Sequence, residues 1–228
     1  TIKAKIILNR FDVKKFFKLF ILFITKLYKH KCHLLNLQVL RLLLPLAIFC
    51  PTIFAADAEE GFVALMDGQT FAGWKPSTEN PGTWKIEDGA FVCRGPRSHL
   101  FYAGDGQPFK NFELKVEVMT EPGANGGIYI HTAYQETGWP KAGFETQVNN
   151  TQKDWKKTGS IYDVASVGFA AAEDNKWWTQ HIIVEGNTVT VRVDGKVISD
   201  FTEPEGWTPP ANFAGRRLAR GTFALQGH

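Results

Sequence analysis

Cysteine is scarce in this chain, with three in 228 residues. Cys32 and Cys50 fall in an N-terminal piece that we expect to lie outside the folded domain, which leaves Cys93 alone. A lone thiol excludes an intrachain disulfide in that domain, and a domain of about 170 residues can bury enough apolar surface without one. The sequence also lacks a close-spaced His/Cys metal pattern, a glycine-rich phosphate loop and a serine elbow.

Net positive charge is absent from residues 57–228, which hold sixteen Lys or Arg against twenty-two Asp or Glu, about −6. Residues 1–56 hold the other ten basic residues and one acidic residue, about +9. The longest basic runs in the acidic part are the pairs Lys156-Lys157 and Arg216-Arg217. We therefore expect no nucleic-acid partner.

Residues 36–58 have the layout of a secretory signal peptide. Arg41 precedes an apolar run at residues 42–50, and small residues follow at Ala55, Ala56 and Ala58. The run is too short for a comfortable membrane span, so a cleaved signal is favoured over a permanent anchor. We expect an exported protein, periplasmic or extracellular, with no stable membrane anchor after cleavage.

Residues 1–35 form an atypical basic and apolar extension without an initiating Met. We expect it to stand outside the fold; the alternative is a second apolar anchor near residues 16–28, which Lys18 and Lys26 make poor. The folded domain is then expected at residues 59–228.

Strand alternation dominates this domain, and no window has sustained helical periodicity. Asp88-Gly89 and Asp194-Gly195 each separate two alternating runs, which predicts tight hairpins with primed turns. Further strands are predicted in "NFELKVEVMT", "GGIYIHT", "GFETQV", "GSIYDV", "QHIIVEG" and "GTFALQG". Many short strands with turn residues between them indicate one all-β domain, a sandwich or jelly roll.

Polar and aromatic side chains alternate with the apolar ones on three of these strands. In residues 143–150, "GFETQVNN", the polar side carries Glu145, Gln147 and Asn149. The other two strands offer Tyr129 with His131, and Gln226 with His228. Fixed donors, acceptors and aromatic rings suit a sugar site. The competing interpretation is an ordinary solvated face, and His131 alone is more often structural than catalytic.

Seven segments occur in the order and spacing of one known family. They are "GFVALMDGQTFAGW", "WKIEDGAFVCRG", "NFELKVEVMTEPGANGGIYIHT", "GFETQVNN", "KTGSIYDV", "WWTQHIIVEGNTVTVRVDGKVI" and "GTFALQGH". Together they resemble the 3-keto-disaccharide hydrolase domain family over residues 60–228. The resemblance implies an all-β, concanavalin A-like jelly-roll sandwich of two antiparallel sheets, exported in bacteria. It also implies a carbohydrate substrate, a glycoside whose sugar carries a ketone at carbon 3.

The chain departs from the family pattern at three places. Asn149 stands where many members have Asp, and His131 stands where Arg is commoner. The chain stops at His228, where the family pattern continues into a last strand, so we expect that strand to be missing.

A ketone at carbon 3 changes the chemistry that a glycosidic site must supply. Ordinary glycoside hydrolysis needs two flanking carboxyl groups, and the row of Glu145, Gln147 and Asn149 supplies one. Next to a ketone, one base can remove the hydrogen on carbon 2, the glycosidic oxygen leaves by elimination, and water then adds.

We assign the base to Glu145 or His131, and sugar contacts to Gln147, Asn149, Tyr129, Tyr162, Gln226 and the loop residue Trp139. His228 is a proton donor or a metal ligand, because a divalent ion held by Glu145, His131 and His228 would stabilise an enolate.

Two other functions fit the same sequence. A non-catalytic carbohydrate-binding module of the laminin G type would rely on the loop aromatics Trp139 and Trp207 and would tolerate changes at Glu145. A two-carboxylate glycosidase would draw its second acid from elsewhere, for example Asp163.

Overall fold

Both Asp-Gly pairs form the tight hairpins that the sequence predicts. Asp88 and Gly89 have φ of 52° and 72°, and Asp194 and Gly195 have φ of 46° and 80°. Two successive residues in the left-handed region match the right-handed twist of the flanking strands. The turns join β4 (Trp84–Glu87) to β5 (Ala90–Cys93) and β11 (Thr188–Val193) to β12 (Lys196–Thr202).

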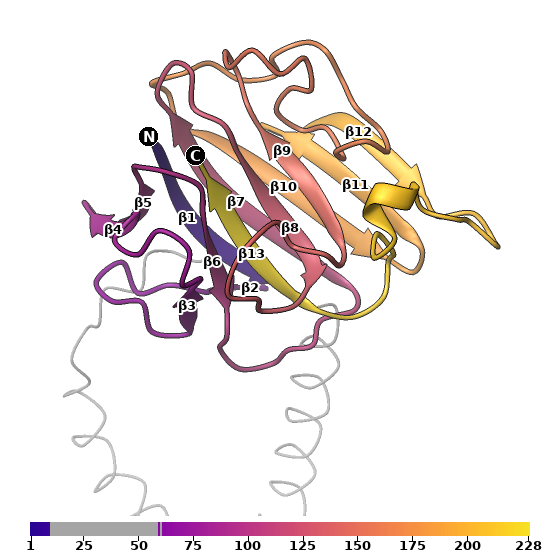
Figure 1. Cartoon of the computed structure of the whole chain (residues 1–228), viewed down its shortest axis with the longest axis horizontal. Coiled ribbons are helices and arrows are strands. Elements are labelled where there is room, and N and C mark those ends of the chain that lie inside the picture. The colour runs from indigo at the N-terminus through magenta and orange to yellow at the C-terminus, as the bar shows by residue number, and fades with distance from the viewer. Residues whose placement is uncertain (10–58, 60) are drawn as a thin grey trace, which may run out of the picture. The chain divides into compact units, whose positions relative to one another are not determined.

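The computed structural model describes residues 1–9, 59 and 61–228, and these residues form an all-β jelly-roll sandwich of two antiparallel sheets (Figure 1). The first sheet has the order β12-β11-β10-β7-β1-β5-β4, with β2 (Phe62–Ala64) paired to β1 (Ile2–Asn9); β7 is Phe112–Thr120 and β10 is Trp178–Glu185. The second has the order β3-β6-β13-β8-β9, which are Trp74–Pro76, Ser98–Tyr102, Thr222–Gly227, Gly126–Thr132 and Phe144–Val148.

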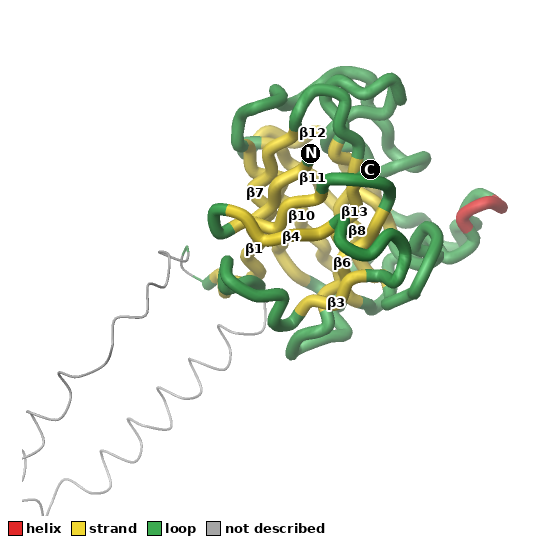
Figure 2. The backbone as a smooth tube through the Cα atoms, turned by 60° about the vertical axis from the view of Figure 1, so that its left-hand side comes forward, coloured by secondary structure: helices red, strands yellow, loops and turns green. Residues whose placement is uncertain are grey.

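Figure 2 shows that loops make up most of the rest of the described chain. Within the described residues the helical structure is one 3-10 turn, η2 (Ala211–Phe213). No helix in the described part is long and apolar enough to cross a membrane. The predicted signal peptide at residues 36–58 and residues 10–35 lie outside the described part.

The core lies between the two sheets and follows the predicted alternation. On β7 every second residue from 112 to 118 is apolar, and the set Phe112, Leu114, Val116 and Val118 is buried. Trp177, at the start of the segment that leads into β10, is 44% exposed, and Lys5 lies over its ring. The prediction of a strand at residues 159–164 is wrong, because that segment makes only isolated bridges.

The expectation that residues 1–35 stand outside the fold is wrong for residues 2–9. This segment is β1, hydrogen-bonded along its length to β7 and at its start to β5. Its own alternation explains the placement, because Ile2, Ala4, Ile6 and Leu8 all point into the core. The basic, apolar composition of the whole N-terminal piece concealed this short strand.

Candidate functional site

The candidate site lies on the face of the five-stranded sheet that points away from the core. Strand register places its side chains in two rows that cross the strands. One row runs Phe101, Ala224, Tyr129 and Glu145, and the next runs His99, Gln226, Gly127 and Gln147. Phe101, Tyr129 and Ala224 form a small apolar cluster of their own on this face.

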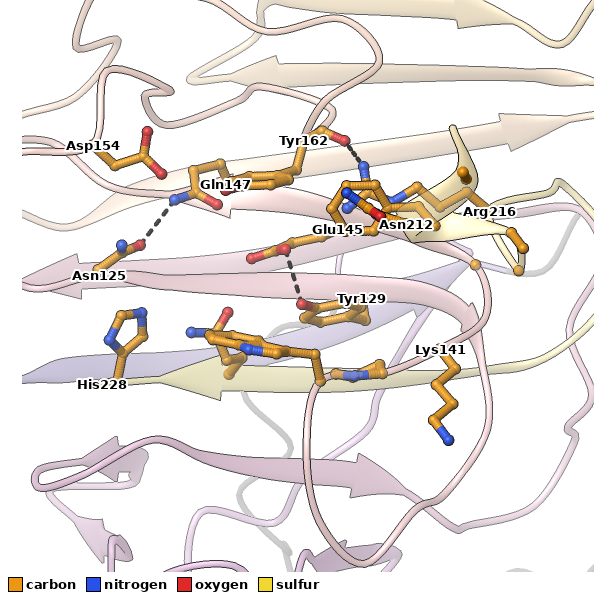
Figure 3. A pocket seen from close by; sticks show the side chains of 18 residues that line it. Asn125, Tyr129, Lys141, Glu145, Gln147, Asp154, Tyr162, Asn212, Arg216 and His228 are labelled. Atoms are coloured by element: carbon orange, nitrogen blue, oxygen red, sulfur yellow. Dashed lines mark hydrogen bonds between the residues drawn. The ribbon is translucent and has the colours of Figure 1, made fainter. Parts of the chain in front are cut away.

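Loops from distant parts of the chain enclose a cavity of about 680 Å³ over these rows. Its polar lining comes from the sheet, from the loop at residues 139–143, from the segment at residues 211–216 and from Asn125, Asp154 and Tyr162 in other loops (Figure 3). Seven residues that the sequence predicts for the site line it: Tyr129, Trp139, Glu145, Gln147, Tyr162, Gln226 and His228.

Glu145 is a buried carboxyl group in this cavity, with 7% of the residue exposed. Burial raises the pKa of its carboxyl to about 7. The Tyr129 hydroxyl donates to Oε2 of Glu145 over 2.8 Å, an interaction that favours the carboxylate and partly opposes the effect of burial (Figure 3). Burial also raises the pKa of Tyr129, so its phenol keeps the proton that it donates. A carboxyl with a pKa near neutral is suited to accept a proton.

Gly127 provides the space into which the Glu145 carboxylate turns. A Cβ atom added at Gly127 would lie 2.4 Å from Oε1 and 2.7 Å from Cγ of Glu145. Because Gly127 has no side chain, the Glu145 carboxylate can occupy this space.

The two glutamines of the site have acceptors that the described residues leave unused. Nε2 of Gln147 donates to Oδ1 of Asn125 over 2.8 Å (Figure 3). Oε1 of Gln147 and Oε1 of Gln226 are buried and have no hydrogen-bond partner among the described residues. Buried polar atoms are rarely left without a partner, so these two acceptors are available to the hydroxyl groups of a ligand.

Positive charge reaches the cavity through Arg216, which is almost fully buried. Its Nη1 donates to the backbone carbonyl of Tyr162, and its guanidinium carbon lies 3.6 Å from the ring centre of Phe213. Burial lowers the pKa of Arg216, while the negative charge of Glu145 opposes that change. Arginine stays protonated in proteins, so Arg216 adds a positive charge to a lining that also contains the Glu145 carboxyl group.

His131 does not join Glu145, and its predicted place in the site is wrong. Its Nε2 lies 2.8 Å from the carbonyl of Lys110, and its Nδ1 accepts from the amide of Ala219 over 3.2 Å. His131 has a φ of 52°, and the ladder between β8 and β13 shifts register beside it. The extra residue in β8 breaks the alternation that would have placed His131 beside Tyr129.

Asn149 is also outside the cavity, although it belongs to the same strand row. Its Nδ2 donates to the carbonyls of Asp154 and Lys156, at 3.0 and 2.9 Å. Asn149 thus holds the loop that carries Asp154, and its predicted contact with substrate is not part of this site.

The proposed metal ligands Glu145, His131 and His228 are not brought together. Both ring nitrogens of His131 are taken by the backbone, and the described residues contain no group of three His, Cys, Asp or Glu placed to hold a metal ion. The residues of this site therefore do not fit the predicted ion.

Sequence reasoning missed the residues that the loops contribute. Arg216, Asp154, Asn125, Lys141 and Asn212 line the cavity, and all of them lie outside the regular strands. In the sequence, Arg216 was distinguished only as one residue of the basic pair Arg216-Arg217. Asp163, the alternative second acid, is not a lining residue; it forms an ion pair with Lys156 at 2.6 Å.

The fold places this chain in the class of jelly-roll sandwiches, with a cavity on the outer face of one sheet. Two crystal structures from Parabacteroides distasonis ATCC 8503, both assigned as glycosyl hydrolases, have this fold. One has a TM-score of 0.61 at 21% identity and covers 73% of this chain and 87% of its own. The other has a TM-score of 0.52 at 21% identity and covers 67% and 90%.

The family within this class follows from the sequence match. The chain belongs to the 3-keto-alpha-glucoside-1,2-lyase-like domain family, whose profile matches residues 61–228. It is 28% identical over 178 residues to a 3-keto-disaccharide hydrolase of Bacteroides thetaiotaomicron. That alignment covers 65% of this chain and 60% of the relative, so the chain matches less than two thirds of the length of that protein.

Proposed function

We propose that this domain cleaves the glycosidic bond of 3-keto-glycosides by base-assisted elimination followed by addition of water. The observation that carries the proposal is Glu145, a buried carboxyl with a pKa of about 7 in a sugar-sized polar cavity. Family membership and the name of the Bacteroides relative support the substrate class.

In the first step Glu145 accepts the proton from carbon 2 of the sugar. The electron pair of that C–H bond forms a double bond between carbons 2 and 3, and the ketone oxygen becomes an enolate oxygen. Because Oε2 of Glu145 is already hydrogen-bonded to Tyr129, Oε1 is the atom that takes the proton. A base whose pKa lies near the working pH combines the correct protonation state with sufficient driving force.

The developing negative charge needs a fixed positive partner. The guanidinium of Arg216 supplies one inside the cavity, and its contacts with Tyr162 and Phe213 hold it in place before the reaction. A preorganised charge of this kind stabilises an enolate far better than mobile water does.

In the second step the enolate collapses and the bond from carbon 1 to the glycosidic oxygen breaks. His228 lines the same cavity and, in its protonated form, gives the leaving oxygen its proton; because burial lowers the pKa of His228, this form is the minor one at neutral pH. Water then adds to carbon 1 and returns its proton to His228, while Glu145 gives its proton back to carbon 2. The net result is hydrolysis, and Glu145 and His228 are regenerated.

Asp154 distinguishes this reaction from hydrolysis by two carboxylates, because it is the other acid that lines the cavity. A two-carboxylate glycosidase would need Asp154 as acid or base and would lose most of its activity when it is changed. Elimination does not use it. We expect Asp154→Asn to keep activity within about tenfold of the wild-type chain.

The test is release of free sugar from a 3-keto-disaccharide and from its unoxidised parent, with and without a chelator. The wild-type chain should cleave only the keto substrate, and Glu145→Gln should not cleave it. Cleavage of the unoxidised parent would favour the two-carboxylate reaction. Binding of either sugar without cleavage would identify a carbohydrate-binding module, and loss of activity with chelator would contradict a site made of these side chains alone.

A further inference from the structure

His99 is a fully buried polar side chain that the proposed reaction does not use. It lies on β6, with 0% of the residue exposed. Neither ring nitrogen has a hydrogen-bond partner among the described residues. A buried donor or acceptor without a partner is costly, so an imidazole that leaves both nitrogens unpaired needs an explanation.

The surroundings of His99 are aromatic. The ring centres of Phe101, Tyr129 and Trp139 lie 6.0, 5.8 and 5.8 Å from that of His99. Burial lowers the pKa of His99 to about 4, so at neutral pH the ring is uncharged and carries one donor and one acceptor. Phenylalanine would fill this position without an unpaired polar atom, which argues against a purely structural reason for histidine.

His99 extends a row of unused polar atoms. Strand register aligns His99 with Gln226 and, beyond Gly127, with Gln147. Each of these three side chains has at least one buried polar atom without a partner among the described residues. The cavity covers Gln226 and Gln147, and its lining does not include His99.

Trp139 lies at the boundary between the cavity and His99. Its indole is nearly perpendicular to two imidazoles, with ring centres 5.8 Å from His99 and 5.7 Å from His228. Trp139 is 47% exposed and lies in the loop that walls the cavity. Edge contacts between rings are individually weak, so the indole can be displaced by a ligand that replaces them.

We propose that His99 is a substrate-binding residue in a second sugar subsite, which Trp139 covers in the empty protein. This inference rests on the proposed function and names the part of the glycoside beyond the keto sugar. When the leaving sugar binds, Trp139 turns away, and hydroxyls of that sugar pair with the ring nitrogens of His99 and with Oε1 of Gln226.

The chemistry of the row favours an uncharged, hydroxyl-rich partner. Neutral imidazole and amide groups offer both donors and acceptors but no net charge. Arg97, whose guanidinium carbon lies 4.4 Å from the ring centre of Trp139, is already paired with Glu79. The aromatic rings around His99 provide the apolar surface on which a sugar ring packs.

The test compares two keto substrates in His99→Phe. One is a 3-keto-disaccharide, and the other is the methyl 3-keto-glycoside of the same sugar, which lacks the second ring. We expect the KM for the disaccharide to rise about threefold to tenfold, the effect of losing one or two neutral hydrogen bonds. The KM for the methyl glycoside and both kcat values should stay unchanged.

His181→Phe is the matched control, because His181 lies on β10 of the other sheet and pairs with Glu113. His181→Phe should leave KM and kcat unchanged for both substrates. If His99→Phe changes neither KM, or changes both equally, the proposal of a second subsite is wrong. The proposed reaction is unaffected by that result.

Calorimetric binding of the unoxidised disaccharide and its methyl glycoside separates the two proposals. If the wild-type chain cleaves neither keto substrate, the proposed function fails, and binding then decides the role of His99. Weaker binding of the disaccharide alone by His99→Phe would support the subsite. Equal binding by the two chains, or no binding of the disaccharide by the wild-type chain, would overturn it.

Discussion

Glu145→Gln should stabilise the folded protein at neutral and alkaline pH while it abolishes catalysis. The change replaces one carboxylate oxygen by an amide nitrogen, and the remaining oxygen can still accept from the Tyr129 hydroxyl. The charge is lost, and with it the cost of keeping an ionised carboxyl in a buried position.

The magnitude follows from the pKa of Glu145, which burial raises from 4.5 to about 7. The folded protein therefore holds this proton more tightly than the unfolded chain does. Stability falls as the pH rises from 4.5 to 7, and the full cost is present above 7. A pKa difference of about 2.5 corresponds to roughly 3 kcal/mol of unfolding free energy.

Urea unfolding of the full chain and of Glu145→Gln, from pH 4.5 to 8, measures this cost. The variant should become more stable than the wild-type chain by about 3 kcal/mol across that interval. Glu205→Gln, in an exposed turn, is the control, and its free energy of unfolding should change with pH in parallel with that of the wild-type chain. Over the same range the kcat/KM of the wild-type chain for the keto substrate should pass through a maximum below pH 7, because the reaction needs ionised Glu145 together with protonated His228, whose pKa is lowered by burial. Stability curves for Glu145→Gln that run parallel to the wild type would refute the raised pKa.

Three further substitutions test the arrangement. Gly127→Ala would place a Cβ 2.4 Å from Oε1 of Glu145, so we expect a loss of about 100-fold in kcat with little change in urea midpoint; normal turnover would contradict the tight fit. Arg216→Ala should lower kcat for the keto substrate about 100-fold or more and leave KM nearly constant, whereas a loss confined to KM would assign Arg216 to ground-state binding. Ile6→Ala, in the buried face of β1, should lower the free energy of unfolding by about 2 to 5 kcal/mol, and Lys3→Ala on the other face of β1 should not; equal effects would contradict the packing of β1.

Local sequence patterns predicted much of the fold. Asp-Gly turns and period-two alternation act over a few residues, so the hairpins and the buried face of β7 could be predicted from sequence. The same alternation identified Glu145, Gln147 and Gln226, because all three lie in regular stretches of strand.

What sequence reasoning missed depends on long-range geometry. His131 does not lie on the predicted face of the sheet, because an extra residue in β8 interrupts the alternation. Arg216 reaches the cavity from a loop whose path no local pattern specifies. β1 is a strand of eight residues that enters the sheet between β5 and β7, both more than eighty residues away in the chain, and composition alone gave no indication of that pairing.

The position of β1 bears on what processing of this chain would produce. If a signal peptidase cut near Ala56 or Ala58, β1 would no longer be covalently joined to the other twelve described strands. Its hydrogen bonds to β5, β7 and β2 and its buried aliphatic face would then have to keep it in place without a covalent link. Loss of the severed strand would open two adjacent sheet edges, which are sites where a strand from another molecule can add. The mature protein would then be a non-covalent pair of fragments, in which the smaller one could be supplied in trans.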